Sequence, residues 1–251
     1  MRRLRQIIAL VAVITLPSIG VPGLATAVDY PKSTFIVPTE MRGIDYLKIP
    51  TSKKVVALTF DAGANAAGQA SIMRTLRLKG VKGTFFLTGK WVRAHPNYTR
   101  NIVVRGHAIG NHSDTHPNFT TLTVAQQRFE IRKAAYFIQQ VSGKAAGPWF
   151  RFPFGARTLT NIKVANNDGY VAVRWTVDTL GWKGTSGGLT AYKVKQRVLS
   201  TLTPGQIVLM HVGSNPTDMS TLDADALPGI IDALRAKGYS FVTLNALLRQ
   251  P

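Results

Sequence analysis

The stretch Val55-Val56-Ala57-Leu58-Thr59-Phe60-Asp61-Ala62-Gly63 is an apolar run that ends on a carboxylate and small residues. Such a run, closed by a glycine, predicts a buried strand from Val55 to Phe60. We expect Asp61 at the carboxyl end of this strand, where Ala62 and Gly63 allow a backbone or a ligand to approach closely. The alternative role for Asp61 is to cap the helix that follows.

The same pattern recurs along the chain, and amphipathic segments separate the apolar runs. This alternation predicts an α/β fold. The other predicted strands are Gly83 to Leu87, Ala108 to Gly110, Trp149 to Phe152, Tyr170 to Val177, Gln206 to Met210 and Ser240 to Val242. The predicted helices are Gln69 to Lys79, Val124 to Val141, Thr158 to Asn166, Thr190 to Leu202 and Leu227 to Lys237.

Four polar residues fall just past the carboxyl ends of predicted strands, namely Asp61, His112, Asp178 and His211. Barrel enzymes carry their chemistry at the carboxyl ends of their strands. Core residues with unrelated roles would have no reason to share that edge. The coincidence therefore favours an enzyme over a protein that only binds.

His112 and His116 are four residues apart. On a helical turn this spacing would place both imidazoles on one face, where they could share a divalent metal. Asp114 would point away from that face. The spacing is also compatible with surface histidines or helix caps, so it does not establish a metal site by itself.

The amino-terminal 27 residues resemble a secretory signal, with a basic start, an apolar stretch and the cleavage pattern Ala25-Thr26-Ala27. Pro17 and Pro22 interrupt the apolar stretch, so we expect cleavage and no transmembrane anchor. The predicted organisation is a signal peptide at 1–27, an extended segment at 28–52 and one domain at 53–251. We expect a secreted monomer, extracellular or associated with the cell wall.

The chain is strongly basic, with 31 Lys and Arg against 12 Asp and Glu. Its cations are spread along the sequence instead of forming one arm, which argues against nucleic-acid binding. For an exported protein, this charge favours contact with anionic cell-wall polymers. The alternative is that the charge only solvates the surface.

The run Gly184-Thr185-Ser186-Gly187-Gly188 fits the G-x-S-x-G pattern of serine hydrolases. That fold needs an acidic residue and then a histidine after the serine. No acidic residue lies between Ser186 and His211, and His211 is the last histidine. The pattern is therefore better interpreted as a glycine-rich loop.

Five motifs in order resemble those of the polysaccharide deacetylases of the NodB-homology type, carbohydrate esterase family 4. They are Thr59-Phe60-Asp61-Ala62-Gly63, His112-Ser113-Asp114-Thr115-His116, Arg151-Phe152-Pro153-Phe154-Gly155, Asp178 with Trp182, and Leu209-Met210-His211. The resemblance spans residues 53–248. It implies a distorted (β/α)7 barrel.

The resemblance also implies roles in hydrolysis of an acetyl group. Asp61 would be the general base and Arg151 would orient it. His211 would be the general acid, assisted by Asp178. The expected activity is deacetylation of N-acetylated amino sugars in an acetylated polysaccharide, with peptidoglycan or chitin-like oligomers as the leading substrates.

The resemblance further implies that His112 and His116 bind a divalent metal, Zn²⁺ or else Co²⁺ or Mn²⁺. By the same resemblance, the residues that contact the substrate around its acetyl group would be Trp182, Leu209 and Pro153.

Ala62 departs from the family pattern, because the family has a second aspartate there that serves as the third metal ligand. The methyl group cannot coordinate a metal, so we expect weaker binding, or a gap filled by water, Asn65 or Asp61. Two alternatives follow. The first is a wall-glycan-binding protein without catalysis, and the second is an esterase acting on O-acetylated glycans such as acetylxylan.

Overall fold

The computed structural model describes residues 29–249, so the predicted signal peptide lies outside the described residues. The strands are β1 (Asp45–Tyr46), β2 (Val55–Ala62), β3 (Thr84–Leu87), β4 (Ala108–Asn111), β5 (Trp149–Phe150), β6 (Val171–Val173), β7 (Val177–Asp178), β8 (Gln206–His211) and β9 (Ser240–Val242). The α-helices are α1 (Gln69–Leu78), α2 (Gly89–Ala94), α3 (Pro96–Val104), α4 (Val124–Ser142), α5 (Leu159–Asn167), α6 (Ala191–Ser200) and α7 (Leu222–Ala236).

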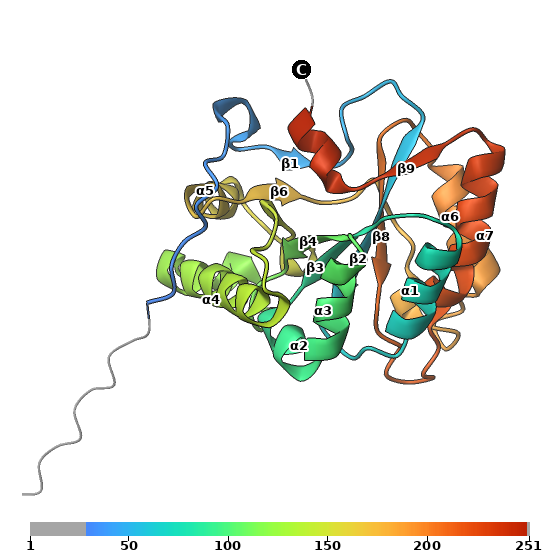
Figure 1. Ribbon diagram of the computed structural model, residues 1–251, viewed down its shortest axis with the longest axis horizontal. Coiled ribbons are helices and arrows are strands. Elements are labelled where there is room, and N and C mark those ends of the chain that lie inside the picture. Colours follow the sequence, from blue (N-terminus) through green and yellow to red (C-terminus); the bar gives the residue numbers. More distant parts are fainter. Residues whose placement is uncertain (1–28, 250–251) are drawn as a thin grey trace, which may run out of the picture.

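The strands form one curled sheet in the order β1-β6-β5-β4-β3-β2-β8-β7, and β9 pairs with β2. Every ladder between these strands is parallel. The helices pack around the sheet (Figure 1). The predicted α/β distorted barrel is confirmed, because the sheet curls on itself and brings the carboxyl ends of its strands together.

Strand β2 shows how the sequence builds this core. Val56, Leu58 and Phe60 belong to the apolar cluster that includes side chains of α1 and α7. Thr59 and Asp61 alternate with them and contact Arg151 instead. The period of two in a strand therefore sends every second side chain of β2 towards the site.

The predicted strand from Tyr170 to Val177 is wrong in one respect, since it breaks into β6 and β7. At the break, Arg174 N donates to Tyr46 O in β1, and Thr176 N donates to Ile207 O in β8. The chain thus changes hydrogen-bonding partners from one edge of the sheet to the other. Such a change depends on which strands are adjacent in the folded protein, so the periodicity of the sequence does not indicate it.

Helices α2 and α3 were not predicted, although both carry start signals. The Thr88 hydroxyl accepts a hydrogen bond from Trp91 N at the start of α2, and Pro96 occupies the first turn of α3. Helix α7 begins at Leu222, five residues before the predicted start, and continues through Pro228. Short helices and an internal proline hide these elements from pattern analysis.

The segment before β2 packs against the barrel. The Tyr30 ring contacts Phe129 and Tyr136, and Val37 and Ile49 are buried in an apolar cluster with sheet residues. Its strand β1 joins the sheet beside β6. Within residues 29–249, no helix has both the length and the apolarity needed to cross a membrane.

Candidate active site

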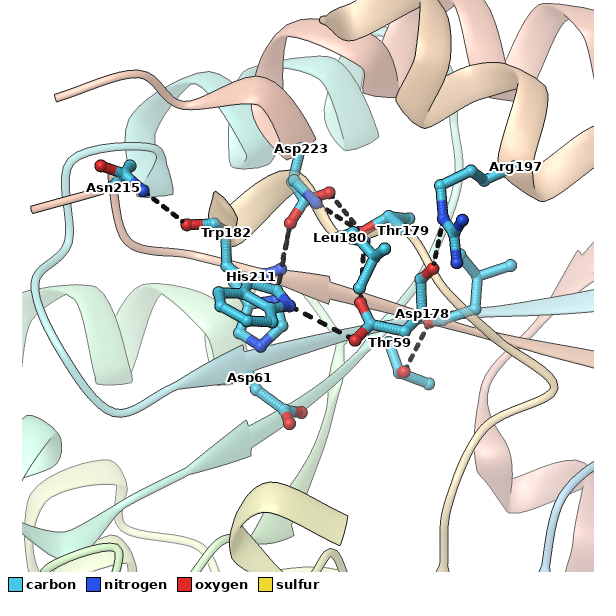
Figure 2. Close-up of polar contacts among 12 residues, drawn as sticks. Thr59, Asp61, Asp178, Thr179, Leu180, Trp182, Arg197, His211, Asn215 and Asp223 are labelled. Carbon is cyan, nitrogen blue, oxygen red and sulfur yellow. Dashed lines mark hydrogen bonds and ion pairs between the residues drawn. The ribbon is translucent and has the colours of Figure 1, made fainter. Parts of the chain in front are cut away.

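Parallel strands place Asp61, His112 and His211 at the same edge of the sheet. Asp61 lies in β2 and is paired in register with His211 of β8, while His112 directly follows β4. In Figure 2, the imidazole of His211 lies between Asp223 on one side and Asp61 on the other. The polar edge expected from the sequence is therefore formed.

Asp61 is almost fully buried and pairs with the guanidinium of Arg151, whose Nη1 lies 2.7 Å from Asp61 Oδ1. Burial alone would raise the pKa of Asp61. The charge and the hydrogen bond of Arg151 lead the interactions that outweigh burial and lower the pKa of Asp61 below its usual value. The carboxylate is thus held in the ionised form that a general base requires.

Arg151 is fully buried at the expected position beside Asp61. Its Nη1 also donates to Thr59 Oγ1 at 2.9 Å, and its Nη2 donates to Arg174 O at 2.8 Å. The guanidinium lies over the ring of Phe86, 4.1 Å from its centroid. These contacts fix the orientation of the guanidinium and, through it, the orientation of the Asp61 carboxylate.

His112 presents one ring nitrogen to the backbone and the other to the Asp61 carboxylate. Its Nδ1 donates to Arg151 O at 2.8 Å, which leaves Nε2 unprotonated in the neutral ring, 3.4 Å from Asp61 Oδ2. Burial lowers the pKa of His112 more than Asp61 raises it. A neutral imidazole oriented by a carbonyl is typical of a metal ligand.

The predicted helical turn through His112 and His116 is wrong, because the chain there is a loop. Ser113 and His116 both have positive φ, and Ser113 Oγ accepts a hydrogen bond from His116 N. This turn brings the two rings to 4.8 Å between centroids. Burial, followed by the neighbouring His112, lowers the pKa of His116 to about 4.

The two neutral imidazoles fit a divalent metal in part. Ala62 is fully buried in the apolar cluster, and Asn65 binds Ser214 through its side-chain amide. Within the part of the chain that the structure describes, no three acidic or histidine side chains form a metal-binding group. The donor set is therefore His112 and His116, with Asp61 as the nearest carboxylate.

His211 has a different carboxylate partner from the expected Asp178. Its Nδ1 lies 3.6 Å from Asp223 Oδ2, and the same oxygen accepts a hydrogen bond from His211 N at 2.8 Å. Burial would lower the pKa of His211, but Asp223, helped by Asp61 and Asp178, raises it above its usual value. The neighbouring carboxylates thus stabilise the protonated imidazole relative to the neutral one.

Asp178 binds the neighbouring loop instead. Its carboxylate accepts hydrogen bonds from Leu180 N at 2.8 Å and from Trp182 Nε1 at 3.3 Å (Figure 2). This anchors the Trp182 ring beside His211, with 6.5 Å between ring centroids. Asp178 does not pair with His211 because the two-residue strand β7 ends in a turn that directs the Asp178 carboxylate back to its own loop.

Asp223 was missed as a site residue, because the sequence around it gave no periodicity and α7 was placed too late. The residue is buried, lies in the first turn of α7 and also accepts a hydrogen bond from Thr179 Oγ1 at 2.6 Å. One sequence feature could have identified Asp223. It is an acidic residue in the first turn of the helix that follows His211.

The remaining expected substrate contacts differ in exposure. Leu209 and Pro153 are buried, whereas Trp182 is half-exposed. Phe154, which was not predicted as a site residue, is 71% exposed and packs edge-on against His116 at 4.6 Å between centroids. Aromatic rings therefore stand beside both the histidine pair and His211.

Backbone strain is concentrated around these groups. Within residues 29–249, the non-glycine residues with positive φ are Ser113, His116, Phe154, Leu180 and Met219. All five lie in loops that follow the carboxyl ends of strands. Such conformations cost about 1–3 kcal/mol each and tend to cluster at functional sites.

Comparisons with known proteins agree with this geometry. The sequence profile of the family described as polysaccharide deacetylase matches residues 48–173. A peptidoglycan-N-acetylglucosamine deacetylase of Bacillus cereus is 35% identical over 200 residues, which cover 80% of this chain and 70% of the relative.

Two solved structures have the same fold. The family 4 carbohydrate esterase PdaA of Bacillus subtilis has a TM-score of 0.74 and 29% identity, covering 82% of this chain and 85% of that one. A family 4 pseudoenzyme from Bacillus anthracis has a TM-score of 0.71 and 32% identity, covering 78% and 66%. A mutant of that pseudoenzyme has restored enzymatic activity. With its profile match and its 35% identical relative, the chain belongs to the polysaccharide deacetylase family.

Proposed function

We propose that this protein removes N-acetyl groups from amino sugars of a wall glycan outside the cell. The observation that carries the proposal is the pairing of two opposed groups at one strand edge. Asp61 is held ionised by Arg151, and His211 is biased towards protonation by Asp223. A hydrolase that attacks an amide needs such a base and such an acid.

Asp61 would take the proton from the water that attacks the acetyl carbonyl. Its Oδ1 is engaged by Arg151, so Oδ2 remains to accept that proton. Oδ2 also lies 3.4 Å from His112 Nε2, so the water would be activated next to the histidine pair. Burial of Asp61 and Arg151 keeps bulk water from screening their interaction.

His112 and His116 would hold the divalent metal, Zn²⁺ being the best match for two imidazoles. When bound, the ion would polarise the acetyl carbonyl and lower the pKa of a bound water. The lowered pKa values of both histidines keep them unprotonated and available as ligands near neutral pH.

His211 would donate its proton to the leaving amine nitrogen when the tetrahedral intermediate collapses. Its side chain is 29% exposed, so a substrate can reach it, and Asp223 stabilises the imidazolium. Trp182 and Phe154 stand on either side of the reacting groups and offer exposed faces to sugar rings.

Peptidoglycan is the favoured substrate class, because the Bacillus cereus relative is a peptidoglycan-N-acetylglucosamine deacetylase. Chitin-like oligomers present the same N-acetylglucosamine group and form the second substrate class. The proposed export and the excess of basic residues both suit an anionic wall.

A second candidate function is glycan binding without catalysis. It is favoured by Ala62, which removes a family metal ligand, and by the similarity to a family 4 pseudoenzyme. On this alternative, the strained loops and exposed aromatic rings would serve sugar recognition only.

Acetate release from peptidoglycan and from N-acetylglucosamine oligomers separates the two functions. The protein is stripped with chelator and then resupplied with Zn²⁺, Co²⁺ or Mn²⁺. We expect metal-dependent release, and a loss of at least about 100-fold in Asp61→Asn and His211→Ala. The surface variant Asp232→Asn is the control, and glycan binding should persist in all three variants. Binding without release under any metal would establish the second candidate.

A further inference from the structure

Three adjoining hollows form one groove, of about 370, 420 and 980 Å³. The first two share Arg77 and Arg105 as lining residues, and the last two share Lys82. The smallest hollow lies between α1 and α3, and the largest is lined mainly by residues 49–53 and 239–246. We call it the basic groove, and its charged lining residues are Lys53, Arg74, Arg77, Lys82, Arg105 and Arg235.

The basic groove lies away from the catalytic edge. Its lining includes residues 80–82 before β3, residues 105 and 107 before β4, and residues 49–53 before β2. It therefore follows the amino ends of strands whose carboxyl ends carry the catalytic groups. The eight residues of β2 separate the two edges by roughly 26 Å.

The charge of the basic groove is not neutralised. None of its lining residues is acidic. Among the ion pairs formed within residues 29–249, none involves its six cationic side chains. Lys82 Nζ donates to Arg105 O at 2.6 Å, and Arg105 Nε donates to Asn101 Oδ1 at 2.9 Å, so these two side chains are oriented by neutral partners.

His107 lies buried in the lining of the groove, and its protonation reflects this positive field. Burial and then the charges of Lys82 and Arg105 lower the pKa of His107 to about 4. Its Nδ1 accepts a hydrogen bond from Gly83 N at 3.1 Å. The histidine is thus neutral near physiological pH, and the surface cations remain available to an anionic partner.

The shape of the groove and the chemistry of its side chains indicate which class of anion it would bind. Four of its six cations are arginines, whose planar forks match phosphate oxygens. A long concave surface suits a linear chain better than a flat bilayer. Nucleic-acid bases would need free aromatic faces to stack on. The rings of Tyr239 and Phe241 in the lining already face Lys54 and Arg235. The third lining ring, Tyr98, packs beside His95 with 6.1 Å between ring centroids.

We propose that the basic groove binds a linear, phosphodiester-bearing polymer of the cell wall and so holds the protein beside its glycan. The proposal relies on the proposed function only for the location in the wall. Because the groove and the catalytic edge are at opposite ends of β2, both ligands can bind at once.

The test uses the full mature chain and poly(glycerol phosphate) as the probe, with affinity measured over a range of salt concentrations. The groove variant is the double substitution Arg77→Gln and Arg105→Gln. The control is Arg128→Gln with Lys163→Gln, which removes the same charge from exposed residues of α4 and α5 that form no ion pair in the described chain.

We expect the groove variant to lose about tenfold or more in affinity, with a shallower salt dependence, while the control stays within about twofold of wild type. Hydrolysis of small N-acetylglucosamine oligomers should be unchanged in both, which keeps this test separate from that of catalysis. Equal losses in the two variants, no binding by wild type, or tighter binding to single-stranded DNA or phosphatidylglycerol vesicles would each overturn the proposal.

Discussion

Asp61 illustrates how one residue is specified by its neighbours. A buried carboxylate would ordinarily be protonated more readily than in water, yet interactions led by the charge and the hydrogen bond of Arg151 reverse this tendency. Arg151 at the position expected beside Asp61 supplies the largest opposing charge. The site therefore depends on a buried ion pair, and removing either partner would leave the other charge uncompensated.

Asp223 should control the pH range of activity through His211. Asp223→Asn removes the charge that raises the pKa of His211. The acid then loses its proton at lower pH, so the alkaline limb of kcat/KM should shift to lower pH, with activity above neutrality falling about tenfold. Asp178→Asn is the control, since Asp178 contributes less to the pKa of His211. Equal shifts in the pH–rate profiles of both variants would contradict the assignment of Asp223.

Ala62→Asp tests the missing ligand. The methyl group is fully buried among apolar side chains, so a carboxylate there should lower the free energy of unfolding by about 2–4 kcal/mol in metal-free protein. If the new carboxylate reaches the histidine pair, Zn²⁺ should restore Tm by binding the folded state. Thermal unfolding with and without Zn²⁺ provides the measurement. If Zn²⁺ leaves the Tm of the variant unchanged, the side chain at position 62 does not reach His112 and His116.

At the scale of elements, the loops after the strands carry the distinguishing features of the site. Residues in left-handed conformation bend the loops after β4 and β7, and the first turn of α7 supplies the partner of His211. The 3₁₀ turn Gly181–Lys183 lies against that turn of α7. A Cβ on Gly181 would collide with the Asp223 carboxylate.

Gly181→Ala should therefore displace Asp223 and damage both stability and catalysis. We expect a loss of about 1–3 kcal/mol in unfolding free energy and a lower kcat. Gly229→Ala within α7 is the matched control. There the new methyl would have only Lys195 Cδ nearby, at 3.5 Å, and the unfolding free energy should rise by about 0.5–1 kcal/mol. Denaturant unfolding and steady-state kinetics distinguish the two, and an unchanged kcat in Gly181→Ala would argue against contact-based positioning of Asp223.

Elements with strong periodicity were predictable, and those defined by contact were not. The strand around Leu58 and the helix from Val124 have clear patterns, and the latter also has a Thr123–Gln126 capping box. The break between β6 and β7 arises because Arg174 and Thr176 bond to opposite edges of the sheet. No local propensity encodes such a change of partner.

At the scale of the whole molecule, the parallel sheet separates two surfaces of different chemistry. The carboxyl ends of the strands gather Asp61, His211 and the histidine pair, while the amino ends border the basic groove. The excess of basic residues is thus spatially organised. Such an arrangement lets a protein attach to one polymer while it acts on another.

Buried histidine should make the folded molecule sensitive to acid. The pKa of His107 is about 4 in the folded protein and has its ordinary value of 6.5 in the unfolded chain, so the unfolded chain binds more protons between these two pH values. The free energy of unfolding should therefore fall as pH drops from 6.5 towards 4, by up to roughly 3 kcal/mol from this residue. His107→Asn keeps an acceptor for Gly83 N and should flatten that slope in denaturant unfolding. An unchanged slope would show that His107 is not the group responsible.

The sequence by itself determined the α/β class, the strand-end positions of Asp61, His112 and His211, and the family, because these depend on local periodicity and on short motifs. Tertiary structure alone decided that Asp223 lies at His211 Nδ1, that Phe154 stands beside His116, that Ala62 packs in the core and that scattered cations form one groove. These outcomes depend on which distant segments the curled sheet brings together. The physical reason is that the periodicity of apolar residues reflects local structure over a few residues, whereas the partner of a side chain depends on which distant residues lie near it in space.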